Sequence, residues 1–126
     1  LLGGCAVDFA SMDVSFISVR TVLPAVRTCV REGAHLAVLV KPQFEARREQ
    51  VGKGGIVRDP QVHREVLLGV IAAAPGMGFA PLGLAVSPIR GAEGNVEFLL
   101  HLRAGAAEPF DAEGAVETAL QAVDSV

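Results

Sequence analysis

A short apolar run that stops abruptly on a lysine and a proline constrains the fold of this chain most. The run covers residues 36–40, and Lys41 and Pro42 follow it directly. Such a run is typical of a strand that is covered on both faces. Because proline cannot donate a ladder hydrogen bond, the chain leaves the sheet at Lys41. The sequence therefore predicts an amine at the carboxyl end of a central strand, where open α/β sheets bind ligands.

The length and composition indicate one small domain. A chain of 126 residues supports one core, and 51% of its residues are hydrophobic. No apolar run approaches the roughly 18 residues of a transmembrane helix. The start of the chain lacks the basic leader of a signal peptide, and it lacks an initiator methionine. We therefore expect a processed or excised piece of a protein.

The cysteines and histidines indicate neither a disulfide framework nor a metal site. Cys5 and Cys29 lie in apolar surroundings, which predicts buried, reduced thiols and a cytoplasmic protein. His35, His63 and His101 are scattered along the chain without the spacing of zinc ligands.

Charge is unevenly distributed along the sequence. The net charge is −3, but residues 104–126 hold five acids and no base, so the remainder is slightly basic. Residues 41–64 hold six bases and three acids, and Lys53 lies there in a Gly-Lys-Gly-Gly stretch. This composition suits a surface that faces RNA phosphates, and the glycines suit an anion-binding nest. An ordinary solvated, flexible loop is the alternative.

Hydrophobic periodicity predicts alternating strands and helices. The first three strands are joined by helical crossovers and should be parallel, whereas a short turn should reverse the last one. The result is a three-layer α/β domain with a mostly parallel sheet. Pro24 should lie near the first turn of its helix, Gly33 should end that helix, and Asp59 should cap the next one. Strands are predicted over 5–12, 35–40, 79–87 and 96–103, a long connection over 42–57, and helices over 18–32, 59–74 and 111–124.

Three ionisable residues in or beside apolar strands are candidates for chemistry. Asp13 ends the first strand at the same sheet edge as Lys41, and Glu97 lies in an apolar strand. A buried carboxylate needs a cation or donors, which Arg90 or Arg103 could supply in a structural ion pair. Asp13 could equally be a turn residue. If the three meet, the carboxylates favour the charged amine and burial favours the neutral one, which would suit a base acting on an alcohol.

Four motifs in this chain resemble one known family. They are DVSFIS at 13–18, LVKPQFEA at 39–46, VGKGGIVRD at 51–59 and GNVEFLL at 94–100. In order and spacing they are similar to the TlyA, or so-called haemolysin, family of FtsJ-like ribose methyltransferases that act on ribosomal RNA. The resemblance covers nearly all of residues 5–103 and leaves the acidic tail at 104–126 outside.

The resemblance implies a Rossmann-like methyltransferase fold and S-adenosylmethionine as the cofactor. It also implies three members of a Lys-Asp-Lys-Glu catalytic tetrad, in which the lysine removes the proton of the ribose 2′-hydroxyl while the carboxylates orient it. By this resemblance the catalytic residues are Asp13, Lys41 and Glu97. The cofactor-binding residues would be Asp13, Val14, Ser15 and Phe16. The RNA-binding residues would be Lys53 and Arg58.

The same resemblance implies that residues 1–103 form the carboxyl-terminal half of the catalytic domain. The first tetrad lysine, the glycine-rich cofactor loop and the acidic ribose ligand have no counterpart in this sequence. We therefore expect this stretch to be inactive and to bind cofactor weakly by itself. Its strands should be ordered first, second, fourth, third, and the exposed edge of the first strand favours self-association. A non-catalytic RNA-binding module that uses the basic 41–64 loop is the alternative function.

Overall fold

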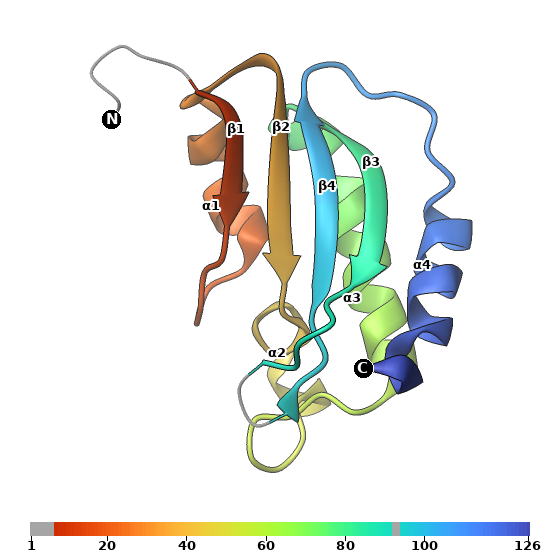
Figure 1. Cartoon of the computed structure of the whole chain (residues 1–126). Helices are drawn as coiled ribbons and strands as arrows, with labels where there is room; N and C mark the ends of the chain where they lie inside the picture. Colours follow the sequence, from red (N-terminus) through yellow and green to blue (C-terminus); the bar gives the residue numbers. More distant parts are fainter. Residues whose placement is uncertain (1–6, 92–93) are drawn as a thin grey trace.

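A four-stranded mixed sheet forms the centre of the computed structural model, which describes residues 7–91 and 94–126. In spatial order the strands are β1 (Val7–Met12), β2 (Val30–Val40), β4 (Phe98–Ala104) and β3 (Phe79–Val86). β1 and β2 are parallel, and β4 runs antiparallel to both of its neighbours (Figure 1). The predicted strand order and the reversed last strand are both confirmed. Residues 5 and 6 of the first predicted strand lie outside the described residues.

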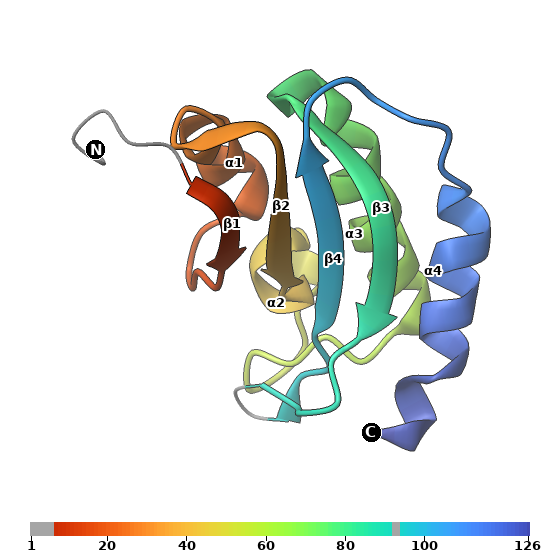
Figure 2. The same ribbon diagram turned by 45° about the horizontal axis from the view of Figure 1, so that its top comes forward.

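Helices cover one face and one edge of this sheet. α1 (Val19–Arg27) and α3 (Pro60–Ala73) lie behind the sheet, and α4 (Ala112–Gln121) lies beside the edge strand β3 (Figures 1 and 2). The α/β class is therefore confirmed, but the described residues form no third layer over the other face. Short helical turns complete the described structure: α2 (Pro42–Glu45), η1 (Arg48–Gln50), η2 (Pro75–Met77) and η4 (Val123–Ser125).

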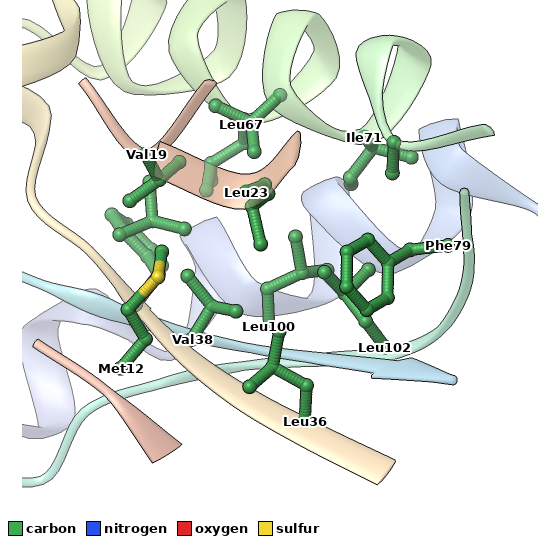
Figure 3. Packing of buried hydrophobic residues seen from close by; sticks show 14 of the residues in the cluster. Met12, Val19, Leu23, Leu36, Val38, Leu67, Ile71, Phe79, Leu100 and Leu102 are labelled. Atoms are coloured by element: carbon green, nitrogen blue, oxygen red, sulfur yellow. The ribbon is translucent and has the colours of Figure 1, made fainter. Parts of the chain in front are cut away.

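The core lies between the sheet and its helices. Alternate residues of β2 and β4 point toward α1 and α3, because side chains alternate between the two faces of a strand. Figure 3 shows Val38 and Leu100 from the sheet packed below Leu23 of α1 and Leu67 of α3, and all four are buried. The opposite face of the same strands carries exposed side chains, among them Leu99.

α3 begins and ends as its sequence predicts. The Asp59 side chain accepts a hydrogen bond from the backbone N–H of Gln61 at 2.9 Å, and Pro60 occupies the first helical position. The turn at Pro75–Met77 stops the helix. Its predicted apolar face is buried in the core: Val62, Val66, Leu67, Val70, Ile71 and Ala74.

The prediction for residues 18–40 is wrong at one boundary. α1 ends at Arg27 rather than near residue 32, and β2 already begins at Val30. Val30 is buried and pairs with Val7, whereas the next pair is His35 with Phe9, so the residues between form an irregular segment. Gly33 has a φ of +84° in that segment instead of ending the helix. Sheet pairing overrides the local helical pattern at this end of the helix. Pro24 lies inside α1 rather than in its first turn, because the helix begins at Val19.

Two other boundaries differ from the prediction, and one irregularity is confirmed. The connection at 42–57 begins with the helical turn α2, since Pro42 has the φ that a first helical position requires. β4 begins at Phe98, so Glu97 immediately precedes the strand. β3 is an edge strand whose register shifts between Pro81 and Gly83, as these two residues predict.

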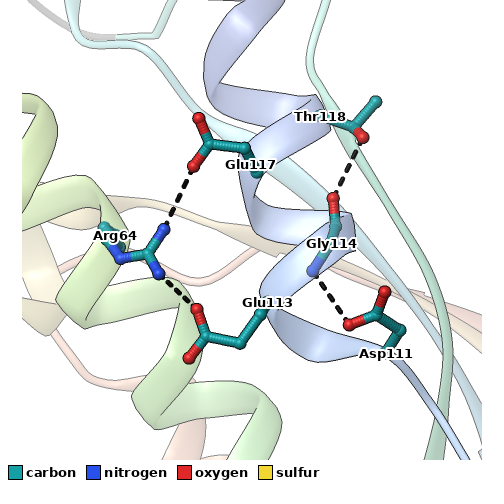
Figure 4. A network of polar contacts seen from close by, with 6 residues as sticks. All are labelled: Arg64, Asp111, Glu113, Gly114, Glu117 and Thr118. Atoms are coloured by element: carbon teal, nitrogen blue, oxygen red, sulfur yellow. Dashed lines mark hydrogen bonds and ion pairs between the residues drawn. The ribbon is translucent and has the colours of Figure 1, made fainter.

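The acidic tail is tied to the domain by ion pairs. Arg64 of α3 contacts Glu113 and Glu117 of α4, with a distance of 3.2 Å from Arg64 Nη1 to Glu117 Oε2 (Figure 4). Asp111 caps α4 by accepting a hydrogen bond from the N–H of Gly114 at 3.0 Å. The predicted helix in the tail is therefore present. Its acids neutralise Arg64, one of the six bases of residues 41–64.

His63 of α3 provides a pH-dependent contribution to stability. Burial lowers the pKa of His63, while a hydrogen bond with the Val57 carbonyl and the charge of Asp59 oppose the shift. Below pH 6.5 the unfolded chain therefore binds a proton that the folded chain resists. We expect the free energy of unfolding to decrease as the pH falls through 6.5 toward the folded pKa. Urea unfolding above and below this pH measures the effect.

The variant for this measurement is His63→Phe. The His63 ring packs edge-on against Phe98, with 5.6 Å between centroids, so a phenyl ring suits the site. His63→Phe should reduce the pH dependence, because it removes the buried imidazole. An equal pH dependence in wild type and His63→Phe would show that His63 does not cause it.

Candidate active site at the carboxyl edge of the sheet

The Lys41 amine and the Asp13 carboxylate meet at the carboxyl ends of β2 and β1. Because these strands are parallel neighbours, the residues that follow them lie at one sheet edge. The Lys41 Nζ forms an ion pair with Asp13 Oδ1 and donates a hydrogen bond to Ser15 Oγ at 3.2 Å. The Lys41 side chain is 11% exposed and that of Asp13 is 63% exposed. The amine is therefore held in a largely buried position beside an anion that solvent can reach.

Glu45 joins the two loops that carry this pair. Its carboxylate accepts hydrogen bonds from Ser18 Oγ at 2.6 Å and from the backbone N–H of Val19 at 2.7 Å. The Glu45 side chain is only 1% exposed, and its position at the start of α1 also suits the helix dipole. Glu45 therefore attaches α2, which follows Lys41, to the N-terminus of α1, which follows the Asp13 loop.

Glu97 lies beside this region but does not form an ion pair with Lys41. Its buried carboxylate accepts a hydrogen bond from Gln43 Nε2 at 3.4 Å, and Gln43 is two residues from Lys41. A Cβ added to Gly91 would lie 1.8 Å from Glu97 Oε2, so the chain approaches the carboxylate closely there. The structural partners considered for Glu97, Arg90 and Arg103, form no ion pair with it among the described residues.

The loop after β1 presents exposed apolar side chains at the same edge. Phe16 is exposed, has a φ of +66°, and stacks in a tilted arrangement on Phe44 with 5.1 Å between ring centroids. The Lys41 Nζ lies 6.0 Å from the centre of the Phe44 ring. Of the residues assigned to cofactor binding, Ser15 contacts the Lys41 amine, Val14 is half-buried, and Asp13 forms the ion pair.

Asn95 supports the loop that carries Lys53 and Arg58. Its Oδ1 accepts a hydrogen bond from the backbone N–H of Val57 at 3.0 Å, and its Nδ2 donates to the Gly55 carbonyl at 2.9 Å. Asn95 is buried, so these contacts fix the loop against the segment before β4. Lys53 and Arg58 are both exposed.

Sequence reasoning missed several residues of this region. Glu45 and Gln43 lie within the LVKPQFEA motif, but nothing local shows that their side chains reach α1 and Glu97. Asn95 reads as a turn residue, although its buried amide bridges two segments 40 residues apart. The signal that could have found them is their position next to Lys41 and Glu97, which are polar residues beside apolar runs.

The fold and the four motifs are those of FtsJ-like methyltransferases. Sequence comparison agrees, because residues 1–104 match the FtsJ-like methyltransferase family, and the chain belongs to this family. The resemblance to TlyA proteins is also confirmed. The chain is 41% identical over 120 residues to the 16S/23S rRNA (cytidine-2′-O)-methyltransferase TlyA of Mycobacterium tuberculosis, covering 95% of this chain and 45% of TlyA.

Two further relatives are consistent with membership of this family. The chain is 56% identical over 95 residues to YqxC of Bacillus subtilis, described as an rRNA methyltransferase, covering 75% of this chain and 34% of YqxC. A solved structure of a Streptococcus thermophilus protein described as a hemolysin matches with a TM-score of 0.83 and 43% identity, covering 94% of this chain and 44% of that protein. The chain thus spans less than half the length of these relatives.

None of the described helices is both long and apolar enough to span a membrane. The described histidines, cysteines and acids include no cluster of three that could hold a metal ion. His35 and His101, scattered in sequence, do meet across β2 and β4, with 2.8 Å between His35 Nδ1 and His101 Nε2. Cys29 is half-buried rather than fully buried, and Cys5 lies outside the described residues.

Proposed function

We propose that the protein to which this chain belongs transfers a methyl group to a ribose 2′-hydroxyl of ribosomal RNA. Membership of the FtsJ-like family supports methyl transfer, and the substrate named for M. tuberculosis TlyA supports ribosomal RNA. The single observation that carries the proposal is the contact between the largely buried Lys41 amine and Asp13 at the carboxyl edge of the sheet. Since ribosomal RNA is the substrate, we also propose a cytoplasmic location.

In this proposal Lys41 is the base and Asp13 supports it. A neutral Lys41 amine takes the proton of the ribose hydroxyl, and the neighbouring Asp13 carboxylate stabilises the ammonium ion that results. Ser15 accepts a hydrogen bond from the amine and helps to direct it. Glu97 acts through Gln43, which lies in α2, the turn that begins directly after Lys41. Glu97 is therefore a positioning residue in this arrangement.

The residues after β1 fit the chemistry of S-adenosylmethionine. When bound, this cofactor supplies an electrophilic methyl group on a cationic sulfonium. The Asp13 carboxylate suits a neighbouring cation, and the exposed Phe16 ring offers an apolar surface for an adenine. Val14 and Ser15 would complete the contact from the same loop. We expect this stretch alone to bind the cofactor weakly. In this proposal the loop after β1 is therefore one part of a larger cofactor site.

Lys53 and Arg58 are the proposed contacts with RNA phosphates. Both side chains are exposed, and no described carboxylate forms an ion pair with either. Phosphate contacts of this kind place the substrate and make binding dependent on salt. An RNA-binding module without catalysis would use the same side chains but would not require Asp13 beside Lys41.

Methyl transfer by the full-length protein tests the function. Labelled S-adenosylmethionine and ribosomal RNA are incubated with the protein, and the RNA is then hydrolysed with alkali. A 2′-O-methyl group blocks attack on the adjacent phosphate, so the labelled nucleotide should remain in an alkali-resistant dinucleotide. Label in a mononucleotide would indicate base methylation, and RNA binding without any transfer would favour the binding module.

We also propose that the 126-residue chain self-associates through β1. This strand lies at the end of the described sheet, and its Phe9 is 64% exposed. Unpaired backbone groups on such an edge can pair with a second strand. We expect light scattering to report a dimer or larger species for this chain at high concentration, and Phe9→Lys to shift it toward monomer. Phe16→Lys, in a loop, is the matched control. A monomeric wild-type chain would exclude the proposal.

A further inference from the structure

A pocket beside the loop that carries Arg58 has, apart from Arg58 itself, no role in the function proposed above. It has a volume of about 460 Å³ and lies between the loop before α3, the turn after β3 and the C-terminal helical segment. Figure 1 shows this end of the chain beside the start of α3. The volume is in the range of roughly 300 to 1,000 Å³ that is typical of small-ligand pockets. Part of the wall is apolar, with Val96, Leu120 and Val123 contributing to it.

Two arginines that line the pocket, Arg58 and Arg90, have no carboxylate partner in the described structure. All 11 lysines and arginines of the chain are among the described residues, and most of them pair with an acid. Those without one are Arg48, Lys53, Arg58 and Arg90, as the ion pairs of the others show. The cations that are not neutralised therefore lie in the loop before α3 and in the turn after β3.

Arg90 is held in place by backbone oxygens. Its Nη1 donates a hydrogen bond to the Gly94 carbonyl at 3.2 Å, and its Nη2 donates to a backbone oxygen of Val126, the last residue of the sequence, at 3.4 Å. These contacts orient the guanidinium toward the end of the chain. A guanidinium in this state is well suited to bind a phosphate, because its planar donors match the phosphate oxygens.

The remaining polar groups of the pocket suit the rest of a nucleotide. Asp124 lines the pocket and is an acceptor for a ribose hydroxyl or a base amino group. The aliphatic side chains of Val96 and Leu120 provide a surface for a base. The walls of the pocket thus offer a cation for the phosphate, an acceptor for the sugar and an apolar surface for the base of one nucleotide.

We propose that this pocket binds one nucleotide of the RNA substrate, adjacent to the nucleotide whose ribose approaches Lys41. The inference rests on the proposed function, because it takes RNA as the substrate. Val96 lines the pocket, whereas the next residue, Glu97, contacts Gln43 on the side of the candidate active site. The segment Val96–Glu97 therefore connects the wall of the pocket to the residues beside Lys41.

Binding of a short single-stranded RNA oligonucleotide to the full-length protein tests the proposal. Fluorescence anisotropy at several salt concentrations gives both the affinity and its salt dependence. Arg90→Ala should weaken binding about tenfold and lower the salt slope by about one, because one charged phosphate contact is lost. Leu120→Trp and Val123→Phe should weaken binding without changing the slope, because they fill the pocket and leave the charges unchanged. Circular dichroism shows which of these two variants folds.

Two further variants separate this proposal from the function itself. Arg31→Ala removes an arginine that is paired with Asp8 at 3.1 Å, and it should leave binding unchanged. Lys53→Ala should weaken binding whether or not the pocket is used. If Lys53→Ala weakens binding and the Arg90 or pocket-filling variants do not, RNA binding stands and the nucleotide pocket is excluded. If the wild-type protein binds no RNA, the proposed function itself is excluded.

Discussion

Replacing Lys41 by alanine in the full-length protein should lower the rate of methyl transfer by at least about 100-fold, the contribution of a well-placed general base. The reason is geometric. The Lys41 amine is largely buried and contacts Asp13 and Ser15, and it is the only lysine at this edge among the described residues, since Lys53 lies in an exposed loop. Single-turnover methylation of ribosomal RNA with labelled S-adenosylmethionine measures the effect.

Two variants make this result specific to the base role. Lys41→Arg keeps a cation next to Asp13 but cannot release its proton at neutral pH, so the rate should remain low. Lys53→Ala should raise KM for RNA with little change in kcat, because it removes a phosphate contact only. A Lys41→Ala protein that folds and keeps the wild-type rate would exclude Lys41 as the base. A normal rate in Lys41→Arg would show that Lys41 contributes only its positive charge.

Replacing Phe98 by alanine should lower the free energy of unfolding by about 3–5 kcal/mol, as for other large-to-small changes of a buried aromatic residue. Phe98 is fully buried at the start of β4, where it pairs with Val40 of β2 and Val86 of β3. It also contacts the ring of His63 in α3. Its removal therefore leaves a cavity where the sheet meets a helix.

Phe9→Ala is the matched control for this prediction. It deletes the same atoms from an exposed position on β1, so its effect should stay within about 0.5 kcal/mol at a protein concentration where the chain is monomeric. The chain has no tryptophan or tyrosine, so urea unfolding is best followed by circular dichroism. Equal losses at the two positions would show that burial of Phe98 does not determine its contribution.

Much of the fold could be predicted because its signals are local. The apolar run before Lys41, the cap at Asp59 and the irregular strand at Pro81 each depend on a few neighbouring residues, and all three appear in the structure. The connection lengths then determine strand direction, because a helical crossover makes neighbouring strands parallel and a short turn reverses them. From this alone Asp13 and Lys41 are expected at one edge of the sheet.

Local patterns fail where a distant partner decides the outcome. Residues 28–32 continue a helical pattern, yet Val30 belongs to β2 because it pairs with Val7. Nothing local to Glu97 shows that its carboxylate accepts a hydrogen bond from Gln43, 54 positions away. The six bases of 41–64 suggest one basic surface, but Lys41, Arg47 and Arg64 are paired with acids.

The sequence by itself determined the strand order, the sheet edge that carries Lys41 and the family to which the chain belongs. Only the tertiary structure decided which charges are neutralised, that Glu45 and Asn95 fasten the loops around the site, and that Arg90 joins Arg58 at one pocket. The physical reason is distance along the chain. Strand and cap signals depend on residues a few positions apart. The contacts of Glu45 and Asn95 join residues 26 to 40 positions apart, whose meeting depends on how the whole sheet and its helices pack.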